Sequence, residues 1–347
     1  LLNMFDAIDY HKNFFKEKLF NNSKLYSIQL IRALACLAVV IFHIEGYVNR
    51  TFNTDNPYSF FAFGKMGVDI FFILSGFIIP YSIYKKEKTQ FKFLYNRFVR
   101  IFPTYIFIIL IFIFSTLLIN KFQLFNIGTE LSLKKTYLSF LFNLGNSTQG
   151  YLQVAWTLFY EMCFYIIFSF MTSRFKSISK TKLFSLSIPS LQLFFLILGK
   201  FYFADFVLGI SIFLLLINPK SLKFNNAYFI YLLSSVFIHL FFDYSSLIIG
   251  LLFIFLILLE YFKSNLFDNL IIKKIADASF SIYIIQEIII SPTIKILNIS
   301  FNRIGLIDYN LIYISSVTGT LFLTVLFGYI LRNTIEIYFY KLLYDPN

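Results

Sequence analysis

The sequence predicts an all-α membrane protein, a bundle of about ten transmembrane helices with both termini in the cytoplasm. Of its 347 residues, 58% are hydrophobic and only 14% are charged, whereas a typical soluble chain has about 25% charged residues. The mean hydropathy is +0.73, and the apolar residues form runs of membrane-spanning length separated by short basic segments. A net charge of +12 distributed in this way favours contact with anionic lipid headgroups over nucleic-acid binding.

Ten apolar segments are predicted to cross the membrane. They cover residues 27–48, 66–84, 99–120, 151–172, 183–199, 202–218, 227–242, 246–262, 276–297 and 310–331. A polar arm (1–26) precedes the transmembrane domain (27–340), and a short tail (341–347) follows it. With the arm in the cytoplasm, 21 of the 30 Lys and Arg residues lie on the cytoplasmic side, eight lie outside, and Arg32 lies inside the first segment. The positive-inside rule therefore places both termini in the cytoplasm.

The first segment, QLIRALACLAVVIFHIE at residues 29–45, carries Arg32 and His43. In an α-helix, side chains eleven residues apart point in directions that differ by about 20° and lie roughly 16 Å apart along the axis. Both side chains therefore lie on one face. An ionisable group inside a span costs ~2.5–3.5 kcal/mol even on the mild insertion scale. Two of them on one face suggest a polar pathway through the protein. The alternative is that Arg32 snorkels to the inner surface and His43 to the outer one.

The second segment places Asp69 near the same outer end as His43. It begins GKMGVDIFFILSGF at residues 64–77, and a helical hairpin would bring the carboxylate and the imidazole together. A carboxylate beside a histidine fixes its tautomer and raises its basicity, which a general base requires. The alternative is that Asp69 only caps a helix that begins at Val68 or Ile70.

Two arginines precede the third segment, in YNRFVRIFP at residues 95–103. Arg97 and Arg100 are three residues apart, on one face at the predicted start of a helix. Paired guanidinium groups there suit a phosphorylated ligand, because each can bind a phosphate with two hydrogen bonds. The alternative is ordinary anchoring to lipid headgroups.

The fourth segment begins VAWTLFYEMCFY at residues 154–165 and places Glu161 inside the outer half of the membrane. A lone intramembrane glutamate is a functional candidate by default, and Trp156 lies at interface depth above it. The preceding outer loop is predicted to hold a short interfacial helix at 136–144. The two cysteines lie in apolar segments and are interpreted as packing residues, with no metal site.

Two later segments carry polar side chains. Ser279, Ser281 and Tyr283 are placed near the cytoplasmic surface, and Glu336 is interpreted as a structural i,i+4 partner of Arg332.

In this order, the motifs resemble the acyltransferase 3 family of integral membrane O-acyltransferases. The resemblance covers residues 26–340 and rests on motifs quoted as they stand in this sequence. They are the arginine and histidine of the first segment, GVDIFFILSGF (67–77), RFVRIFP (97–103), WTLFYEMCFY (156–165), ASFSIY (278–283) and Glu336. The sequence departs from the family pattern at Gln286 and Glu287, where a histidine and a proline are frequent, and after Glu336, where a proline is usual.

The resemblance implies an enzyme of the bacterial cytoplasmic membrane. It would move an acetyl or other short acyl group from cytoplasmic acetyl-CoA to a hydroxyl of a cell-envelope or exported polysaccharide. The three arginines would hold the CoA phosphates, with Ser279 and Tyr283 as further donor contacts. His43 would be the base or the transient acyl carrier, Asp69 would orient it, and Glu161 would be a second acid or base or hold the sugar.

Trp156 and Tyr160 are expected to pack on sugar faces. The acceptor sugar, direct transfer against an acyl-histidine intermediate, and the oligomeric state stay open. The alternatives from other classes are a polytopic glycan transporter, for which no repeated halves are evident, and an envelope glycan polymerase, for which the outer loops are short.

Overall fold

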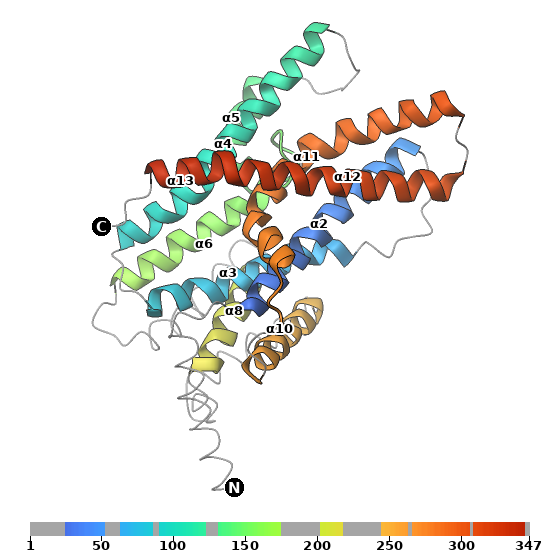
Figure 1. Cartoon of the computed structure of the whole chain (residues 1–347). Helices are drawn as coiled ribbons and strands as arrows, with labels where there is room; N and C mark the ends of the chain where they lie inside the picture. Colours follow the sequence, from blue (N-terminus) through green and yellow to red (C-terminus); the bar gives the residue numbers. More distant parts are fainter. Residues whose placement is uncertain are drawn as a thin grey trace, which may run out of the picture. The chain divides into compact units, whose positions relative to one another are not determined.

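The computed structural model describes residues 25–52, 63–85, 90–122, 131–174, 202–217, 244–262, 266–305 and 308–343. Every regular element in these ranges is helical (Figure 1). The helices are α2 (Tyr26–Phe52), α3 (Met66–Lys85), α4 (Gln90–Phe122), α5 (Leu133–Phe140), α6 (Ala155–Arg174), α8 (Tyr202–Ile217), α10 (Tyr244–Phe262), α11 (Leu270–Ile304), α12 (Tyr309–Leu331) and α13 (Ile337–Leu343). A 3₁₀ turn, η2 (Phe142–Gly145), follows α5, and one π-helical turn, η4 (Arg332–Glu336), joins α12 to α13.

Five helical stretches among the described residues are long and apolar enough to cross a membrane: Tyr26–Phe52, Phe63–Ser82, Lys92–Lys121, Leu270–Ile304 and Asn310–Leu343. Three shorter apolar helices accompany them, at Ala155–Phe170, Ala204–Leu216 and Leu247–Glu260. The prediction of an all-helical membrane protein is therefore confirmed. Eight of the ten predicted segments lie on these helices, and the other two, 183–199 and 227–242, lie outside the described residues, as do residues 1–24 and 344–347.

Several helices extend beyond the apolar segments that predicted them. The third segment was expected from residue 99, but α4 begins at Gln90. The ninth was expected over 276–297, but α11 runs from Leu270 to Ile304. The interfacial helix expected at 136–144 is α5 followed by the η2 turn. The extensions mix apolar residues with Gln, Lys, Asn and Arg, so hydropathy alone does not mark where these helices begin.

The described residues group into two compact units. Of the described residues, the first unit holds 25–35, 68–85, 90–94, 163–174, 202–217, 244–262 and 266–273, and the second holds 36–52, 63–67, 95–122, 131–162, 274–305 and 308–343. Phenylalanine rings dominate the interior of the first unit. Phe164 of α6 stacks on Phe206 of α8 with centroids 4.3 Å apart, and Phe77 of α3 meets Phe253 of α10 edge to face at 5.1 Å.

Two glycines of the first unit let α3 and α8 approach backbone to backbone. A Cβ atom on Gly209 of α8 would lie 2.1 Å from the carbonyl oxygen of Ile73, and one on Gly76 of α3 would lie 2.2 Å from that of Phe206. No side chain fits in this space, so these positions require glycine, as at the close helix contacts of many membrane proteins.

In the second unit, the loop before α6 is braced against α4. The Tyr105 hydroxyl of α4 donates a 2.6 Å hydrogen bond to the carbonyl oxygen of Ser139, and the Ser139 hydroxyl accepts one from the backbone N–H of Tyr151 at 2.8 Å. Asn143, a buried residue with φ of +57°, donates from its side chain to the carbonyl oxygen of Leu152 at 2.6 Å. A non-glycine residue in this left-handed conformation is strained, and the surrounding hydrogen bonds hold it there.

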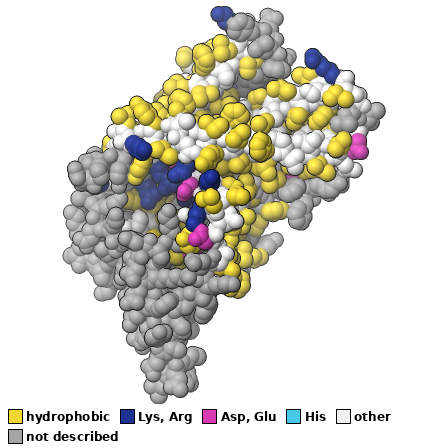
Figure 2. Space-filling view, viewed as in Figure 1, with side chains coloured by type: hydrophobic (Ala, Val, Ile, Leu, Met, Phe, Trp, Pro, Cys, Tyr) yellow, Lys and Arg dark blue, Asp and Glu magenta, His cyan; other side chains and the backbone are white. Residues whose placement is uncertain are grey.

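The helices α12, η4 and α13 follow one another without a break in the second unit (Figure 1). Their exposed side chains are mostly large and apolar, as Figure 2 shows; they include Leu311, Ile314, Phe322, Phe327, Ile330, Tyr338 and Leu342. The opposite pattern holds inside, where Ser316, Thr320 and Thr324 are fully buried. Apolar side chains outside and small polar ones inside are expected of a helix that faces lipid.

The close approach of α3 and α8 predicts that Gly209→Ala destabilises the protein. The added methyl group must push the backbone of α3 away, and such overpacking typically costs about 1–3 kcal/mol. Thermal unfolding of the detergent-solubilised protein measures the change. Gly319→Ala on α12 is the matched control, because no described atom lies within 4 Å of its Cβ position. A Gly209→Ala variant as stable as the Gly319→Ala variant would contradict the prediction.

Candidate functional site

Arg32 and His43 lie on the single unbroken helix α2, and both side chains are half-buried. The helical spacing predicted from the sequence therefore applies: eleven residues put them on one face, roughly 16 Å apart along the axis. Arg32 belongs to the first compact unit and His43 to the second. α2 thus carries a cationic side chain near its start and an imidazole about three turns further along.

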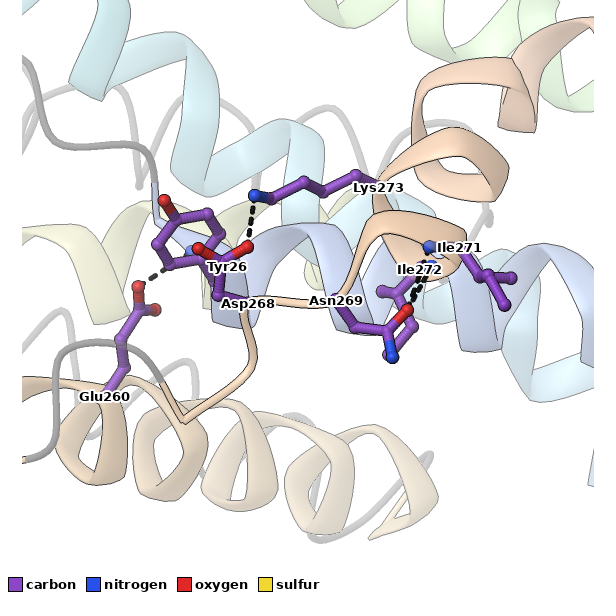
Figure 3. Close-up of polar contacts among 7 residues, drawn as sticks. All are labelled: Tyr26, Glu260, Asp268, Asn269, Ile271, Ile272 and Lys273. Atoms are coloured by element: carbon purple, nitrogen blue, oxygen red, sulfur yellow. Dashed lines mark hydrogen bonds and ion pairs between the residues drawn. The ribbon is translucent and has the colours of Figure 1, made fainter.

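The start of α2 is held by a buried glutamate of α10 (Figure 3). Both oxygens of Glu260, which is 2% exposed, accept hydrogen bonds from the first two N–H groups of the helix, those of Tyr26 at 2.7 Å and Ser27 at 2.8 Å. A carboxylate at this position satisfies free backbone donors and complements the positive end of the helix dipole. Arg32 follows within two turns, so Glu260 fixes the part of α2 that carries it.

An exposed ion pair lies beside the start of α2. Lys273 of α11 binds Asp268 and also lies over the ring of Tyr26, 4.5 Å from its centroid. The hydrogen bond from Lys273 lowers the pKa of the Asp268 carboxyl group. Asn269 adds a side-chain cap to the start of α11, accepting from the backbone N–H groups of Ile271 and Ile272 (Figure 3).

In the second unit, α11 holds the start of α6. Glu287, 7% exposed, accepts hydrogen bonds from the backbone N–H groups of Gln153 at 2.6 Å and Val154 at 3.1 Å. One turn earlier, the hydroxyl group of Tyr283 lies 2.9 Å from that of Thr157 and donates to the carbonyl oxygen of Val154 at 3.3 Å. These contacts fix the first turn of α6 and therefore the side chains that follow from it.

The helix α6 carries three of the predicted site residues. The rings of Trp156 and Tyr160 meet edge to face with centroids 5.9 Å apart, and Tyr160 donates a long hydrogen bond of 3.4 Å to the carbonyl oxygen of Gly145. Glu161 is half-buried and near enough to Tyr283 of α11 to interact with it electrostatically. The structure therefore brings the predicted residues of α6 and α11 together.

A hydrogen bond and an electrostatic interaction link α2 to α11 within the second unit. The Cys36 thiol donates to the carbonyl oxygen of Ser279 at 3.4 Å. Eleven residues further along α2, Tyr47 interacts electrostatically with Glu287 of α11. The two helices therefore run alongside each other over this length, with His43 between the two interactions.

The position of Tyr283 differs from the expectation. It was placed near the cytoplasmic surface, but α11 begins six residues before the expected segment, and Tyr283 bonds to the first turn of α6. That turn follows the loop predicted to lie outside. Tyr283 therefore lies beside the start of α6, and a cytoplasmic Tyr283 and an outer start of α6 are two predictions that do not hold together.

The two arginines of α4 also lie differently. Arg97 and Arg100 are half-buried on one face of α4, but this helix begins at Gln90. The unpaired N–H groups of the helix start therefore lie about two turns away from the arginines. The expected anion site, in which these N–H groups and the two arginines lie together, is not formed. The neighbouring Tyr95 donates to the carbonyl oxygen of Leu343 at 2.8 Å, which puts this part of α4 beside the end of α13.

The expected pairing of Glu336 with Arg332 is also wrong. The Ser281 hydroxyl of α11 donates to Glu336 at 2.5 Å, and Arg332 approaches Asp277 of α11 at 4.0 Å. The cause is the π-helical turn between the two residues, because a wider turn no longer places positions i and i+4 above each other.

Asp69 lies in the first turn of α3, a helix that begins at Met66. It is therefore a first-turn carboxylate rather than the cap of a helix beginning at Val68 or Ile70. It belongs to the first unit and His43 to the second, and their pairing stays a prediction.

Glu260 and Glu287 were missed as anchors, although each is an acidic residue in an apolar run, which is a signal of function or structure in a membrane span.

The contacts of Glu287 predict that Glu287→Gln destabilises the protein. The amide keeps one acceptor but turns its NH₂ group toward a backbone N–H, so one hydrogen bond to a charged group is lost, worth about 1.5–3 kcal/mol. Thermal unfolding in detergent measures this loss. The matched control is Asp277→Asn, an acid of the same helix whose side chain is 51% exposed and whose distant ion pair contributes little. Equal melting temperatures for the two variants would contradict the role of Glu287 as an anchor.

Comparison with known families adds an independent observation to this geometry. The sequence profile of a family described as an acyltransferase domain matches residues 25–332. No curated protein and no solved structure matches the chain. The matched region covers nearly all of the described helices, including those that carry His43, Glu161 and Tyr283. The chain therefore belongs to the acyltransferase 3 family.

Proposed function

We propose that this protein transfers an acetyl or other short acyl group from cytoplasmic acyl-CoA to a hydroxyl of a cell-envelope or exported polysaccharide. The observation that carries the proposal is α2, one unbroken helix that carries Arg32 in its second turn and His43 eleven residues further along. The separation of these two side chains along the helix suits a donor that has charged phosphates at one end and a reactive thioester at the other. Membership of a membrane acyltransferase family supports the same reaction class.

In this reaction His43 acts as the general base. It takes the proton of the acceptor hydroxyl while the oxygen attacks the thioester carbon. The C–S bond then breaks, the ester forms, and the CoA sulfur leaves with the proton returned by the imidazolium. Asp69 orients the imidazole, and Glu161 serves as a second acid or base or holds the sugar. Transient acylation of His43 is the variant of the same chemistry in which the imidazole attacks first.

The acyl donor is bound from the cytoplasmic side. Arg32, Arg97 and Arg100 hold the CoA phosphates, because guanidinium groups bind phosphate oxygens in pairs. Ser279 and Tyr283 contact the acyl-CoA between its phosphates and its thioester. Tyr283 lies nearer the thioester, because it bonds to the first turn of α6. No metal takes part in this scheme.

The acceptor is bound on the outer side, beside α6. Trp156 is half-buried and can place its ring against a sugar face. Tyr160 is only 4% exposed and lies edge to face against Trp156, so it supports that ring. This arrangement corresponds to a multi-pass protein of the bacterial cytoplasmic membrane with both termini inside, in contact with membrane lipids and with no nucleic-acid partner.

The proposal predicts that His43→Ala abolishes acyl transfer while the protein still folds. Without the imidazole no group at this position can remove the hydroxyl proton, and loss of a general base typically lowers kcat by about 100- to 10,000-fold. Transfer of labelled acetyl from acetyl-CoA to surface glycan measures the effect, and the melting temperature reports folding. Leu34→Ala, which changes an exposed side chain of the same helix, is expected to retain activity. A His43→Ala variant with normal transfer would disprove the assignment.

The donor site predicts that Arg97→Ala and Arg100→Ala raise the KM for acyl-CoA. Each variant removes charge-assisted hydrogen bonds to phosphate, each worth about 1.5–3 kcal/mol. With an acyl-pantetheine donor, which lacks the nucleotide phosphates, the variants and the wild type should have the same KM. Arg303→Ala, an exposed arginine at the far end of α11, is the control. Equal increases in KM with both donors would show that the arginines do not bind phosphate.

A further inference from the structure

The side chain of Gln286 on α11 is fully buried without a hydrogen-bond partner. Its exposed fraction is 0%, and neither the amide nitrogen Nε2 nor the amide oxygen Oε1 bonds to any residue in the described ranges. Leaving a buried donor or acceptor unsatisfied costs about 1–3 kcal/mol. An apolar side chain of the same size would avoid that cost, so the amide needs a reason other than stability.

The polar neighbours of Gln286 on α11 are all satisfied. Ser281 bonds to Glu336, the Tyr283 hydroxyl bonds to the first turn of α6, and both oxygens of Glu287 accept backbone N–H groups. Gln286 is therefore the exception on a stretch of helix that otherwise pairs its buried polar groups. Because Glu287 is fully used as an anchor, the adjacent amide is the group still available to bind a ligand.

Gln286 lies at the level of His43. The Cys36–Ser279 contact aligns α2 with α11, and both residues of interest follow it by seven positions, about 10 Å along their helices. The electrostatic interaction of Tyr47 with the carboxylate that follows Gln286 is consistent with this alignment of the two helices. A ligand that reacts beside His43 is therefore at the depth of this amide.

We propose that Gln286 is a catalytic residue whose Nε2–H group donates a hydrogen bond to the carbonyl oxygen of the acyl group during transfer. This inference rests on the proposed function. When the acceptor oxygen attacks the thioester carbon, the electron pair of the C=O double bond moves onto the carbonyl oxygen. It returns when the C–S bond breaks. A fixed amide donor in a site without bulk water stabilises this transient charge, as side-chain amides do in other acyl-transfer enzymes.

The test is Gln286→Met, which keeps the volume and removes both hydrogen-bonding atoms. We expect kcat to fall by about 100- to 1,000-fold, the usual effect of losing one oxyanion donor, with little change in the KM of acyl-CoA or of the acceptor. Hydrolysis of acyl-CoA without an acceptor should fall by the same factor, because it forms the same charged oxygen. The melting temperature should stay the same or rise, since an unsatisfied buried amide is removed.

Thr320→Val on α12 is the matched control, because its hydroxyl is equally buried and has no partner among the described residues. It should leave kcat unchanged. A lower melting temperature of Gln286→Met would reveal a structural partner and overturn the proposal, and so would an unchanged kcat.

A raised KM for the acceptor with full kcat and unaffected hydrolysis would also overturn it, by assigning the amide to acceptor binding. A wild-type protein that transfers no acyl group would instead overturn the proposed function on which this inference rests.

Discussion

The structure depends on how the free N–H groups at helix starts are satisfied where water is absent. In a lipid environment each unpaired backbone group costs several kcal/mol, and two glutamates solve this problem in the same way. Glu260 binds the first two N–H groups of α2, and Glu287 binds two N–H groups at the start of α6. The helices anchored in this way carry His43, the proposed general base, and Trp156, the proposed sugar-binding ring.

Such anchoring gives the proposed site its rigidity. The residues proposed to act on the acyl group lie on helices rather than on loops, and α11 connects to both of its neighbours. Its contacts reach Cys36 on one side and Thr157 on the other. Side chains on elements that are tied together at several points keep the geometry that acyl transfer needs.

Much of this architecture could be predicted from the sequence. Apolar runs predicted the all-helical membrane fold, the spacing of Arg32 and His43 placed them on one helix, and the ordered motifs identified the family. Helix starts were predicted poorly, because α4 and α11 begin in stretches where Lys, Arg, Asn and Gln interrupt the apolar residues and lower the hydropathy. The roles of Glu260 and Glu287 could not be predicted, since each depends on a partner more than a hundred residues away. Gln286 stood out only as a departure from the family pattern, and its lack of a partner needed the coordinates.

The hydrogen bonds between Glu260 and the start of α2 also affect the biogenesis of the protein. The two partners are separated by 234 positions in the chain. Because Glu260 is synthesised after α2, the first N–H groups of α2 lack this partner until the 234 residues that separate Tyr26 from Glu260 have been made. The region around Arg32 thus reaches its final form late in biogenesis, so a chain released early from translation would lack the complete proposed donor site.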